Sequence, residues 1–314
     1  MPSDYNRPRP GERIRSRSPR SQTITRHVRD YLSALAAGLM FLVARLLPPS
    51  AAATVGDRLL RVLGPLQRKH GKVLRNLHQV LPDATPEELR RVARDVWANV
   101  GAVLFEYPHI ERIVDERINV TMPPSVEAMF EARRPMLFLT GHLANWEVLP
   151  AYVSRRGNGL VVVYSPHENP LIERMVQRLR AHTGCEYVTK QEALRRITPR
   201  FLKGRSVGLL PDVRVDSGPL LPLFGADAPT TISPARLANR LEYPLVPVRA
   251  KRTGPARFDV EFGEPLVVDE EQRGKLAAIE LMCQFNATLE TWIAERPGEW
   301  LCTKRRWPKE ARVA

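Results

Sequence analysis

The sequence predicts an α/β fold: a mixed, mostly parallel sheet flanked by helices, with an N-terminal helical segment that associates with a membrane. From residue 126 onward, short apolar runs alternate with longer segments of helical periodicity, which is typical of a sheet covered by helices. Polar and small residues follow several of these runs, as they do at the carboxyl ends of strands that build a site. Upstream, Tyr31–Leu47 is almost continuously apolar and follows an arginine-rich flank.

Length, charge and cysteine content limit the classes of protein to be considered. A chain of 314 residues can bury a sizeable core as one large domain or two small ones. Its 48 Lys and Arg outnumber its 34 Asp and Glu, and the net charge of +14 indicates an anionic partner, such as nucleic acid, an anionic membrane or an acidic substrate. The three cysteines are far apart and lack metal-like spacing, so we expect a reducing compartment and no metal site.

The N-terminal region divides into a tail and an apolar helix. Residues 1–25 are rich in Arg, Ser and Pro and should form a disordered basic tail before a single domain over residues 26–314. The Arg-Ser run suits either an RNA-binding tail or the cytoplasmic flank of a membrane segment. Residues 31–47 would form a helix about 25 Å long, shorter than a bilayer core of roughly 30 Å. We expect this helix to anchor in the membrane or insert at its surface; the alternative is a buried core helix.

The remaining elements follow from periodicity and from start and stop signals. Residues 51–107 have helical periodicity, and Thr85, Pro86 and the two acidic residues after them mark a helix start. The expected strands are 136–140, 160–164, 206–210, 244–250 and 257–262. The expected helices are 125–133, 169–182, 190–203, 232–242 and 271–296. No glycine-rich P-loop and no G-x-G-x-x-G motif is present, so the sequence gives no support for nucleotide binding.

The stretch after the first of these strands has the residues of a catalytic base. A buried strand ends at Thr140-Gly141, His142 follows at once, and Glu147 stands five positions later. On one regular helix these two side chains would point about 140° apart, so contact requires His142 in the loop or first turn and Glu147 one turn inside. A His held by a carboxylate can take a proton from a substrate hydroxyl. The alternative is a His that caps a turn and a solvated Glu.

Four further polar blocks follow predicted strands. They span residues 164–170, 211–218, 222–231 and 244–248. Each alone also suits a turn, because Pro, Asp, Asn and Gly are turn formers, and Asp212 is the strongest functional candidate among them. Since they lie at strand ends next to His142, we expect them to form one composite site.

Taken together, these motifs resemble those of the lipid A biosynthesis lauroyl and myristoyl acyltransferases, within the lysophospholipid acyltransferase superfamily. The likeness runs from about residue 31 to residue 308. The matching positions are the apolar helix, Leu81-Pro82-Asp83, Asn99, Gly101, Glu106, Gly141-His142 with Glu147, Tyr164 with Asn169-Pro170, Pro211-Asp212, Pro222-Leu223-Phe224 with Thr230-Thr231, and the segment from Trp300 to Trp307. This chain has Ser165 where the family commonly has Arg.

The resemblance implies transfer of a fatty acyl chain from a thioester to a lipid hydroxyl. The donor would be acyl carrier protein or coenzyme A, with no other cofactor. His142 would be the general base and Glu147 its orienting partner. The block at 211–218, with Asp212 and Arg214, would bind a lipid A-type glycolipid acceptor, and Asn169 would also contact substrate. Alternative acceptors are another phosphoglycolipid, such as a phosphatidylinositol mannoside, or a lysophospholipid.

The expected partners are an acyl carrier protein or acyl-CoA, an anionic glycolipid and the cytoplasmic face of the inner membrane. Basic residues such as Lys304-Arg305-Arg306 would attract all three through their electric field. The competing class is a basic nucleic-acid-binding protein with an Arg-Ser tail. It explains the charge, but the aromatic and basic motifs of RNA-binding modules are missing and the apolar stretch 31–47 stays unexplained. We therefore expect no nucleic-acid partner.

Overall fold

The computed structural model describes residues 19–268 and 274–308. The α-helices are α1 (Pro19–Leu46), α2 (Pro49–Leu63), α3 (His70–Val80), α4 (Pro86–Glu106), α5 (Ile110–Glu116), α6 (Pro124–Glu131), α7 (Val148–Arg156), α8 (Pro170–Arg180), α9 (Lys190–Arg196), α10 (Pro199–Leu202), α11 (Ser233–Leu241) and α12 (Gly274–Glu295). The strands are β1 (Ile118–Thr121), β2 (Leu137–Leu139), β3 (Leu160–Tyr164), β4 (Cys185–Thr189), β5 (Ser206–Leu209), β6 (Leu220–Leu223), β7 (Ala226–Pro229), β8 (Leu245–Gly254) and β9 (Arg257–Phe262).

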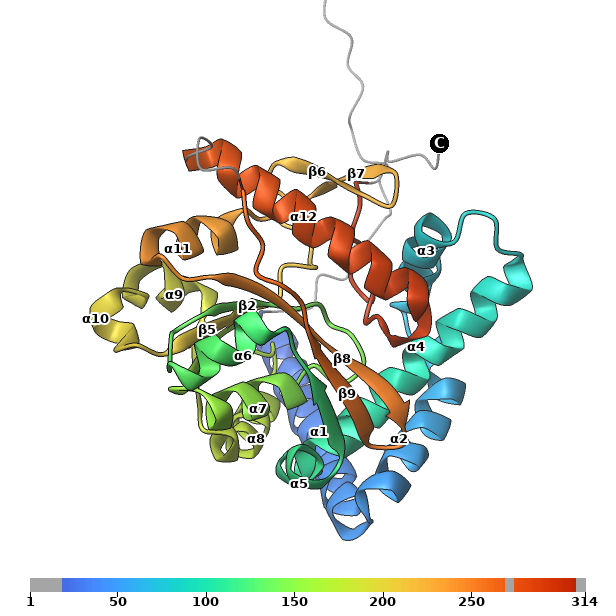
Figure 1. Ribbon diagram of the computed structural model, residues 1–314. Coiled ribbons are helices and arrows are strands. Elements are labelled where there is room, and N and C mark those ends of the chain that lie inside the picture. The colour runs from blue at the N-terminus through green and yellow to red at the C-terminus, as the bar shows by residue number, and fades with distance from the viewer. Residues whose placement is uncertain (1–18, 269–273, 309–314) are drawn as a thin grey trace, which may run out of the picture.

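Seven strands form one central sheet in the order β1-β9-β8-β2-β5-β3-β4, and β6 and β7 form a separate antiparallel hairpin (Figure 1). Within the sheet every neighbouring pair is parallel except β8 and β9. The predicted mixed, mostly parallel sheet flanked by helices is therefore confirmed. β2 and β5 lie side by side at its centre, which is where the site develops.

Helices cover both faces of the sheet, and β2 contributes to both layers of the core. Leu137 and Leu139 pack in the cluster that includes buried residues of α11 and α12. Phe138 points the other way and packs among buried residues of α6 and α7. All three side chains are buried, as expected for a central strand whose side chains alternate between two covered faces.

The helices before β1 form a side layer in which α2 and α4 cross closely. A Cβ on Gly101 would lie 1.9 Å from the Gly56 carbonyl oxygen, so two facing glycines permit this approach. α1 meets the carboxyl end of α4 through a small cluster of Ala44, Ala52 and Phe105, in which Ala52 belongs to α2. Within α1, the segment His27–Leu46 is long and apolar enough to cross a membrane by length and composition, and 11% of its most apolar window is buried.

The predicted elements agree with the structure in the core and differ at its periphery. β2, β3, β5, β8 and β9 match the five expected strands to within a few residues, apart from the longer end of β8. Four strands were not anticipated: β1 and β4 are half-buried edge strands, and β6 and β7 contain prolines. The helix expected over 190–203 is two helices, because Thr198 caps a second helix that starts with Pro199.

The predicted disordered tail falls mostly outside the described residues. Residues 1–18 are not described, whereas α1 already begins at Pro19 and so includes the end of the 1–25 stretch. The predicted helix over 31–47 is present and ends at Leu46, before Pro48 and Pro49.

Candidate active site

The register of the two central strands brings His142 and Asp212 together. β2 and β5 are parallel, and Leu139 pairs with Leu209 at their carboxyl ends. His142 and Asp212 each stand three positions after these paired residues, so both side chains emerge at the same edge of the sheet. Gly141, just before His142, packs closely, because a Cβ there would lie 2.8 Å from the end of the Leu289 side chain.

His142 and Asp212 make a two-point contact. The Nδ1 atom of His142 lies 2.7 Å from Asp212 Oδ1, and the backbone N–H of His142 donates to Oδ2 at 3.0 Å. The indole N–H of Trp300 also donates to Oδ2, at 3.2 Å. The carboxylate thereby fixes both the backbone and the ring of His142 and favours the tautomer with its proton on Nδ1.

Asp212 is held in its charged form despite its burial. Burial alone would raise the pKa of Asp212, but the neighbouring His142 and hydrogen bonds from His142 and Trp300 hold that pKa below its ordinary value. The Asp212 side chain is 2% exposed, whereas that of His142 is 27% exposed. A buried, ionised carboxylate behind a partly open imidazole is the arrangement expected of a general base with an orienting partner.

The segment after α12 closes the site. The backbone N–H of Leu301 donates to the His142 carbonyl at 2.8 Å, and Ala144 donates to Glu299 at 3.0 Å, so residues 299–301 pair with the loop like a short strand. A cavity of about 70 Å³ lies beside this pairing. His142 and Asp212 line it together with Val213, Arg214 and residues 300–306.

Glu147 lies elsewhere, and the expected contact with His142 is replaced by another. Its carboxylate accepts hydrogen bonds from Tyr107 at 2.6 Å, Trp146 at 3.2 Å and Arg180, with which it forms a buried ion pair. The physical reason is that α7 begins only at Val148. Residues 143–147 are an irregular loop, which turns Glu147 into the interior while His142 points to the cavity.

Burial would raise the pKa of Glu147, but Arg180 and the donors around it hold that pKa below its ordinary value. Arg180 also stacks on two tyrosines, with its guanidinium 4.7 Å from the Tyr187 ring centroid and 5.6 Å from that of Tyr164. Glu147 therefore joins the loop to α8 and to the end of α4, and its contacts are those of a positioning residue.

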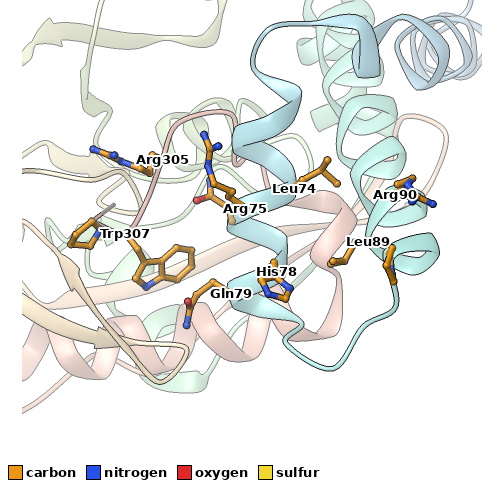
Figure 2. A pocket seen from close by; sticks show the side chains of 11 residues that line it. Leu74, Arg75, His78, Gln79, Leu89, Arg90, Arg305 and Trp307 are labelled. Carbon is orange, nitrogen blue, oxygen red and sulfur yellow. The ribbon is translucent and has the colours of Figure 1, made fainter. Parts of the chain in front are cut away.

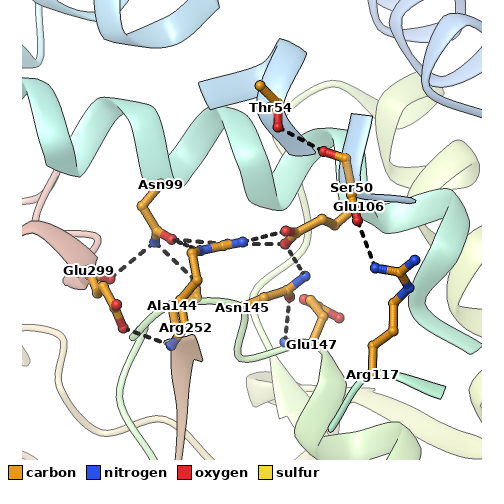
Figure 3. Close-up of polar contacts among 10 residues, drawn as sticks. All are labelled: Ser50, Thr54, Asn99, Glu106, Arg117, Ala144, Asn145, Glu147, Arg252 and Glu299. Atoms are coloured by element: carbon orange, nitrogen blue, oxygen red, sulfur yellow. Dashed lines mark hydrogen bonds and ion pairs between the residues drawn. The ribbon is translucent and has the colours of Figure 1, made fainter. Parts of the chain in front are cut away.

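A second network of polar side chains holds the loop 143–147 against α4 and β8 (Figure 3). Arg252 of β8 pairs with the fully buried Glu106 and donates to Asn99 Oδ1, both on α4. Asn99 in turn donates to the carbonyls of Ala144 at 3.0 Å and Glu299 at 3.1 Å, and Asn145 donates to Glu106 at 2.8 Å. This network joins α4, β8, the loop and the closing segment.

The same network explains an unusual backbone conformation. Ala144 has φ of 45°, a left-handed conformation that a residue with a Cβ adopts at a cost. Both backbone polar groups of Ala144 are hydrogen-bonded, its carbonyl to Asn99 and its N–H to Glu299. The surrounding contacts therefore impose this turn, which sends His142 and Glu147 to opposite sides of the loop.

A comparison with protein-family models connects this geometry to a known group. The model for bacterial lipid A biosynthesis acyltransferases matches residues 18–309, which is most of the chain. The protein belongs to that family. A comparison with curated proteins gave no match. The predicted family and the predicted enzyme class, an acyltransferase, are both confirmed.

In this acyltransferase, two residues predicted to bind substrate occupy very different places. Arg214 lines the cavity with His142, and it also contacts Asp216 and the Trp307 carbonyl. Asn169 instead caps α8: its Oδ1 accepts from Leu171, and its Nδ2 donates to Asp30 and Ser33 of α1. The amide of Asn169 is thus engaged in joining two helices, and the predicted contact with substrate stays a prediction.

Sequence reasoning missed several members of the acyltransferase site. Asp212 was expected at the acceptor rather than on the imidazole, and Arg180, Arg252 and Trp300 had no assigned role. Asn99 and Glu106 were noted only as matching positions on a helix. Asn99 and Glu106 stand seven positions apart, which puts both side chains on one face of a helix, and they were the one signal that could have indicated a polar network there.

Proposed function

We propose that this acyltransferase moves a fatty acyl chain from a thioester to a hydroxyl of a lipid A-type glycolipid, with His142 as general base. The observation that carries the proposal is the pair of His142 and buried Asp212 at the ends of adjacent parallel strands, opening on a cavity. The donor would be acyl carrier protein or coenzyme A. The acceptor is the hydroxyl whose proton His142 removes.

The proposed reaction has two steps. Nε2 of His142 takes the proton of the acceptor hydroxyl as its oxygen attacks the thioester carbonyl, while Asp212 stabilises the imidazolium. The tetrahedral intermediate then breaks its carbon–sulfur bond, and the imidazolium returns the proton to the departing thiolate. The products are an ester and a free thiol, so atoms and charge balance.

Positive charge beside the cavity supports this chemistry. Arg306 lines the cavity, is 2% exposed, and its guanidinium is fixed by the Pro229 carbonyl and the Thr230 hydroxyl. A preorganised cation in a buried site stabilises the negative charge that develops on a carbonyl oxygen. In this proposal Arg306 stabilises that negative charge. Arg214, which also lines the cavity, binds the anionic acceptor.

The test is the initial rate of acyl transfer from a long-chain acyl thioester to Kdo-lipid A, to a phosphatidylinositol mannoside and to a lysophospholipid. His142→Ala should lower turnover about 10²–10⁴-fold with little change in unfolding free energy. His182→Ala removes an exposed imidazole on another element and is the matched control. Near-normal turnover by His142→Ala would refute the mechanism, and a preference for either of the other two acceptors would refute the lipid A assignment.

We further propose that the enzyme works at the cytoplasmic face of the inner membrane through α1 and α2. Large apolar side chains are exposed along α1, including Tyr31 at 66%, Leu35 at 71% and Leu39 at 60%, and more follow on α2. A groove of about 570 Å³ lies between α1 and α8, and Arg174 and Arg178 of α8 line it. An apolar face beside arginines matches the acyl chains and phosphates of an anionic bilayer.

Flotation with vesicles of anionic phospholipid tests this surface. Replacing Leu35 and Leu39 together by Glu should move most of the protein from the vesicle fraction to the soluble fraction. Leu276→Glu is the control, since Leu276 is equally exposed at 72% but lies on α12. Full flotation of the double variant would show that the main membrane contact lies elsewhere.

A further inference from the structure

A second cleft, much larger than the catalytic cavity, lies between α3, the start of α4 and the segment after Trp300. Its volume is about 780 Å³, against about 70 Å³ for the cavity at His142. The smaller cavity has room for a reacting group but not for the body of a substrate. The two spaces share one lining residue, Arg305, so they adjoin each other across the segment 304–306.

The walls of this cleft carry positive charge. Arg75 and His78 come from α3, Arg90 from α4 and Arg305 from the closing segment (Figure 2). Arg90 pairs with Glu87. Among residues 19–268 and 274–308, neither Arg75 nor Arg305 has a hydrogen-bond or ion-pair partner, so both guanidinium groups are available to an anion. Between the charges, the floor is apolar and includes Leu74, Leu89 and Trp307.

A buried amide joins the two backbone segments that carry Arg75 and Arg305. Asn76, next to Arg75 and 2% exposed, donates to the carbonyls of Cys302 at 2.8 Å and Lys304 at 2.7 Å. Its own carbonyl accepts the backbone N–H of Arg306 at 3.2 Å. These three bonds clamp α3 onto both sides of Arg305. The backbone on both sides of the cleft is therefore fixed, and Arg75 and Arg305 extend from it.

The position of the cleft favours one substrate over the other. α1 meets α4 at its carboxyl end, where Tyr107 contacts Phe41 and His109 bonds to Ala44. The cleft lies at the opposite end of α4, around Pro86–Arg90. Because α4 has 21 residues, these two ends are about 25–30 Å apart. A donor that arrives from solution can reach the cleft, whereas an acceptor held in the membrane lies nearer to α1.

We infer that this cleft binds the phosphate of the acyl donor's pantetheine arm, with Arg75 and Arg305 as its ligands. The inference rests on the proposed thioester chemistry. Both candidate donors, acyl carrier protein and coenzyme A, carry their thioester on a pantetheine chain that ends in a phosphate. With the phosphate between the two guanidinium groups, the chain passes Arg305 and its thioester enters the cavity at His142. Arginine is the side chain best suited to hold a phosphate in this way.

Binding of free coenzyme A tests the cleft without requiring turnover. Isothermal titration is performed in the His142→Ala background, so that a failure of the proposed general base leaves the measurement intact. Arg75→Gln and Arg305→Gln should each weaken binding about tenfold or more, since hydrogen bonds to charged groups carry free energies of that size. Arg94→Gln, an exposed arginine one turn beyond Arg90 on α4, should bind like its parent. Equal binding by all of these proteins would overturn the inference.

Kinetics with paired donors identifies the phosphate and its source. With acyl-phosphopantetheine, acyl-CoA or acyl carrier protein as donor, Arg75→Gln should raise the donor KM about tenfold and leave kcat and the acceptor KM unchanged. With acyl-pantetheine, which lacks the phosphate, wild type and variant should be equal. An equal loss with acyl-pantetheine, or a rise in the acceptor KM alone, would overturn the assignment. If wild type uses no thioester at all, the proposed function fails, which is a separate result.

Discussion

The carboxylates of Asp212 and Glu147 both lie beside the loop 140–147, at 4% and 3% residue exposure, and both have pKa values lowered by cationic or hydrogen-bonding neighbours. Their partners differ. Asp212 holds the partly open imidazole of His142, whereas Glu147 is enclosed by Arg180, Tyr107 and Trp146. One carboxylate faces the imidazole that we propose as the general base, and the other fixes the loop that carries this imidazole. Proximity in sequence is therefore a poor guide to which carboxylate assists a His.

The largest expected effect is a difference in kcat between variants of the two carboxylates. Asp212→Asn keeps the size of the side chain but no longer supports an imidazolium, so kcat should fall about 10²–10⁴-fold. Glu147→Gln should lose far less in kcat and more in stability. Initial rates and urea unfolding of both variants measure the contrast.

A double variant sharpens the same comparison. In the proposed mechanism His142 and Asp212 act as a unit, so adding Asp212→Asn to His142→Ala should cost little further activity. A kcat loss in Glu147→Gln as large as that in Asp212→Asn, with unchanged unfolding free energy, would reverse the two roles.

The next effect concerns the stability of the enclosed region. Arg180→Met leaves Glu147 buried without its counter-ion, which typically costs about 3–5 kcal/mol. Arg155→Met removes an arginine whose ion pairs with Glu111 and Asp115 are far more exposed, and such pairs are worth about 0–1 kcal/mol. Urea unfolding of the two variants gives the difference directly. Similar losses would show that the Glu147 pair is no more important than a surface pair.

A smaller effect is expected from the network behind the loop. Asn99→Ala removes the hydrogen bonds to Ala144 and Glu299 and takes from the buried Ala144 carbonyl the donor that Asn99 supplies, at a cost of about 1–3 kcal/mol. Because the loop then shifts relative to the cavity, kcat should fall about tenfold with little change in KM. Loss of stability with an unchanged kcat would show that the network supports the fold without positioning His142.

The smallest effect is a pH dependence of stability. Since the folded-state pKa of Glu147 is lowered, its ionised form adds stability above the ordinary carboxyl value of about 4.3. That contribution is lost as the pH falls through the lowered folded-state value. Unfolding free energies measured from pH 7 down to acid should therefore decline less steeply for Glu147→Gln than for wild type. Parallel profiles would mean that Glu147 titrates alike in the folded and unfolded chains.

The fold could be predicted where burial leaves a simple pattern. The central strands β2, β3 and β5 are apolar runs, and Thr85 and Pro86 mark the start of α4. The hairpin of β6 and β7 was read as a turn-forming block, because it contains prolines and closes through Phe224 and Gly225, both with positive φ. Short edge strands such as β1 carry too little alternation to be distinguished from loops.

The site was predicted in part. The strand end before His142 was visible in the sequence, but the pairing of Leu139 with Leu209 was not, and that register decides which carboxylate meets the imidazole. Asn169 illustrates an ambiguity of residue type: an Asn suits a ligand contact or a helix cap, and the structure shows the cap. Buried ion pairs such as that of Glu106 with Arg252 join elements far apart in the chain, and the hydrophobic periodicity of the sequence does not indicate them.

The pairing of residues 299–301 with the loop after β2 also determines when the site can form during folding. Asn99 and Glu299, which bond directly, are 200 positions apart in the chain. Contacts of such long range close a large loop and are slow to form, while helices such as α4 form from local interactions. Recovery of activity after dilution from denaturant should therefore lag behind recovery of helical circular dichroism. The chain can acquire most of its secondary structure while His142 still lacks the segment that holds it in place.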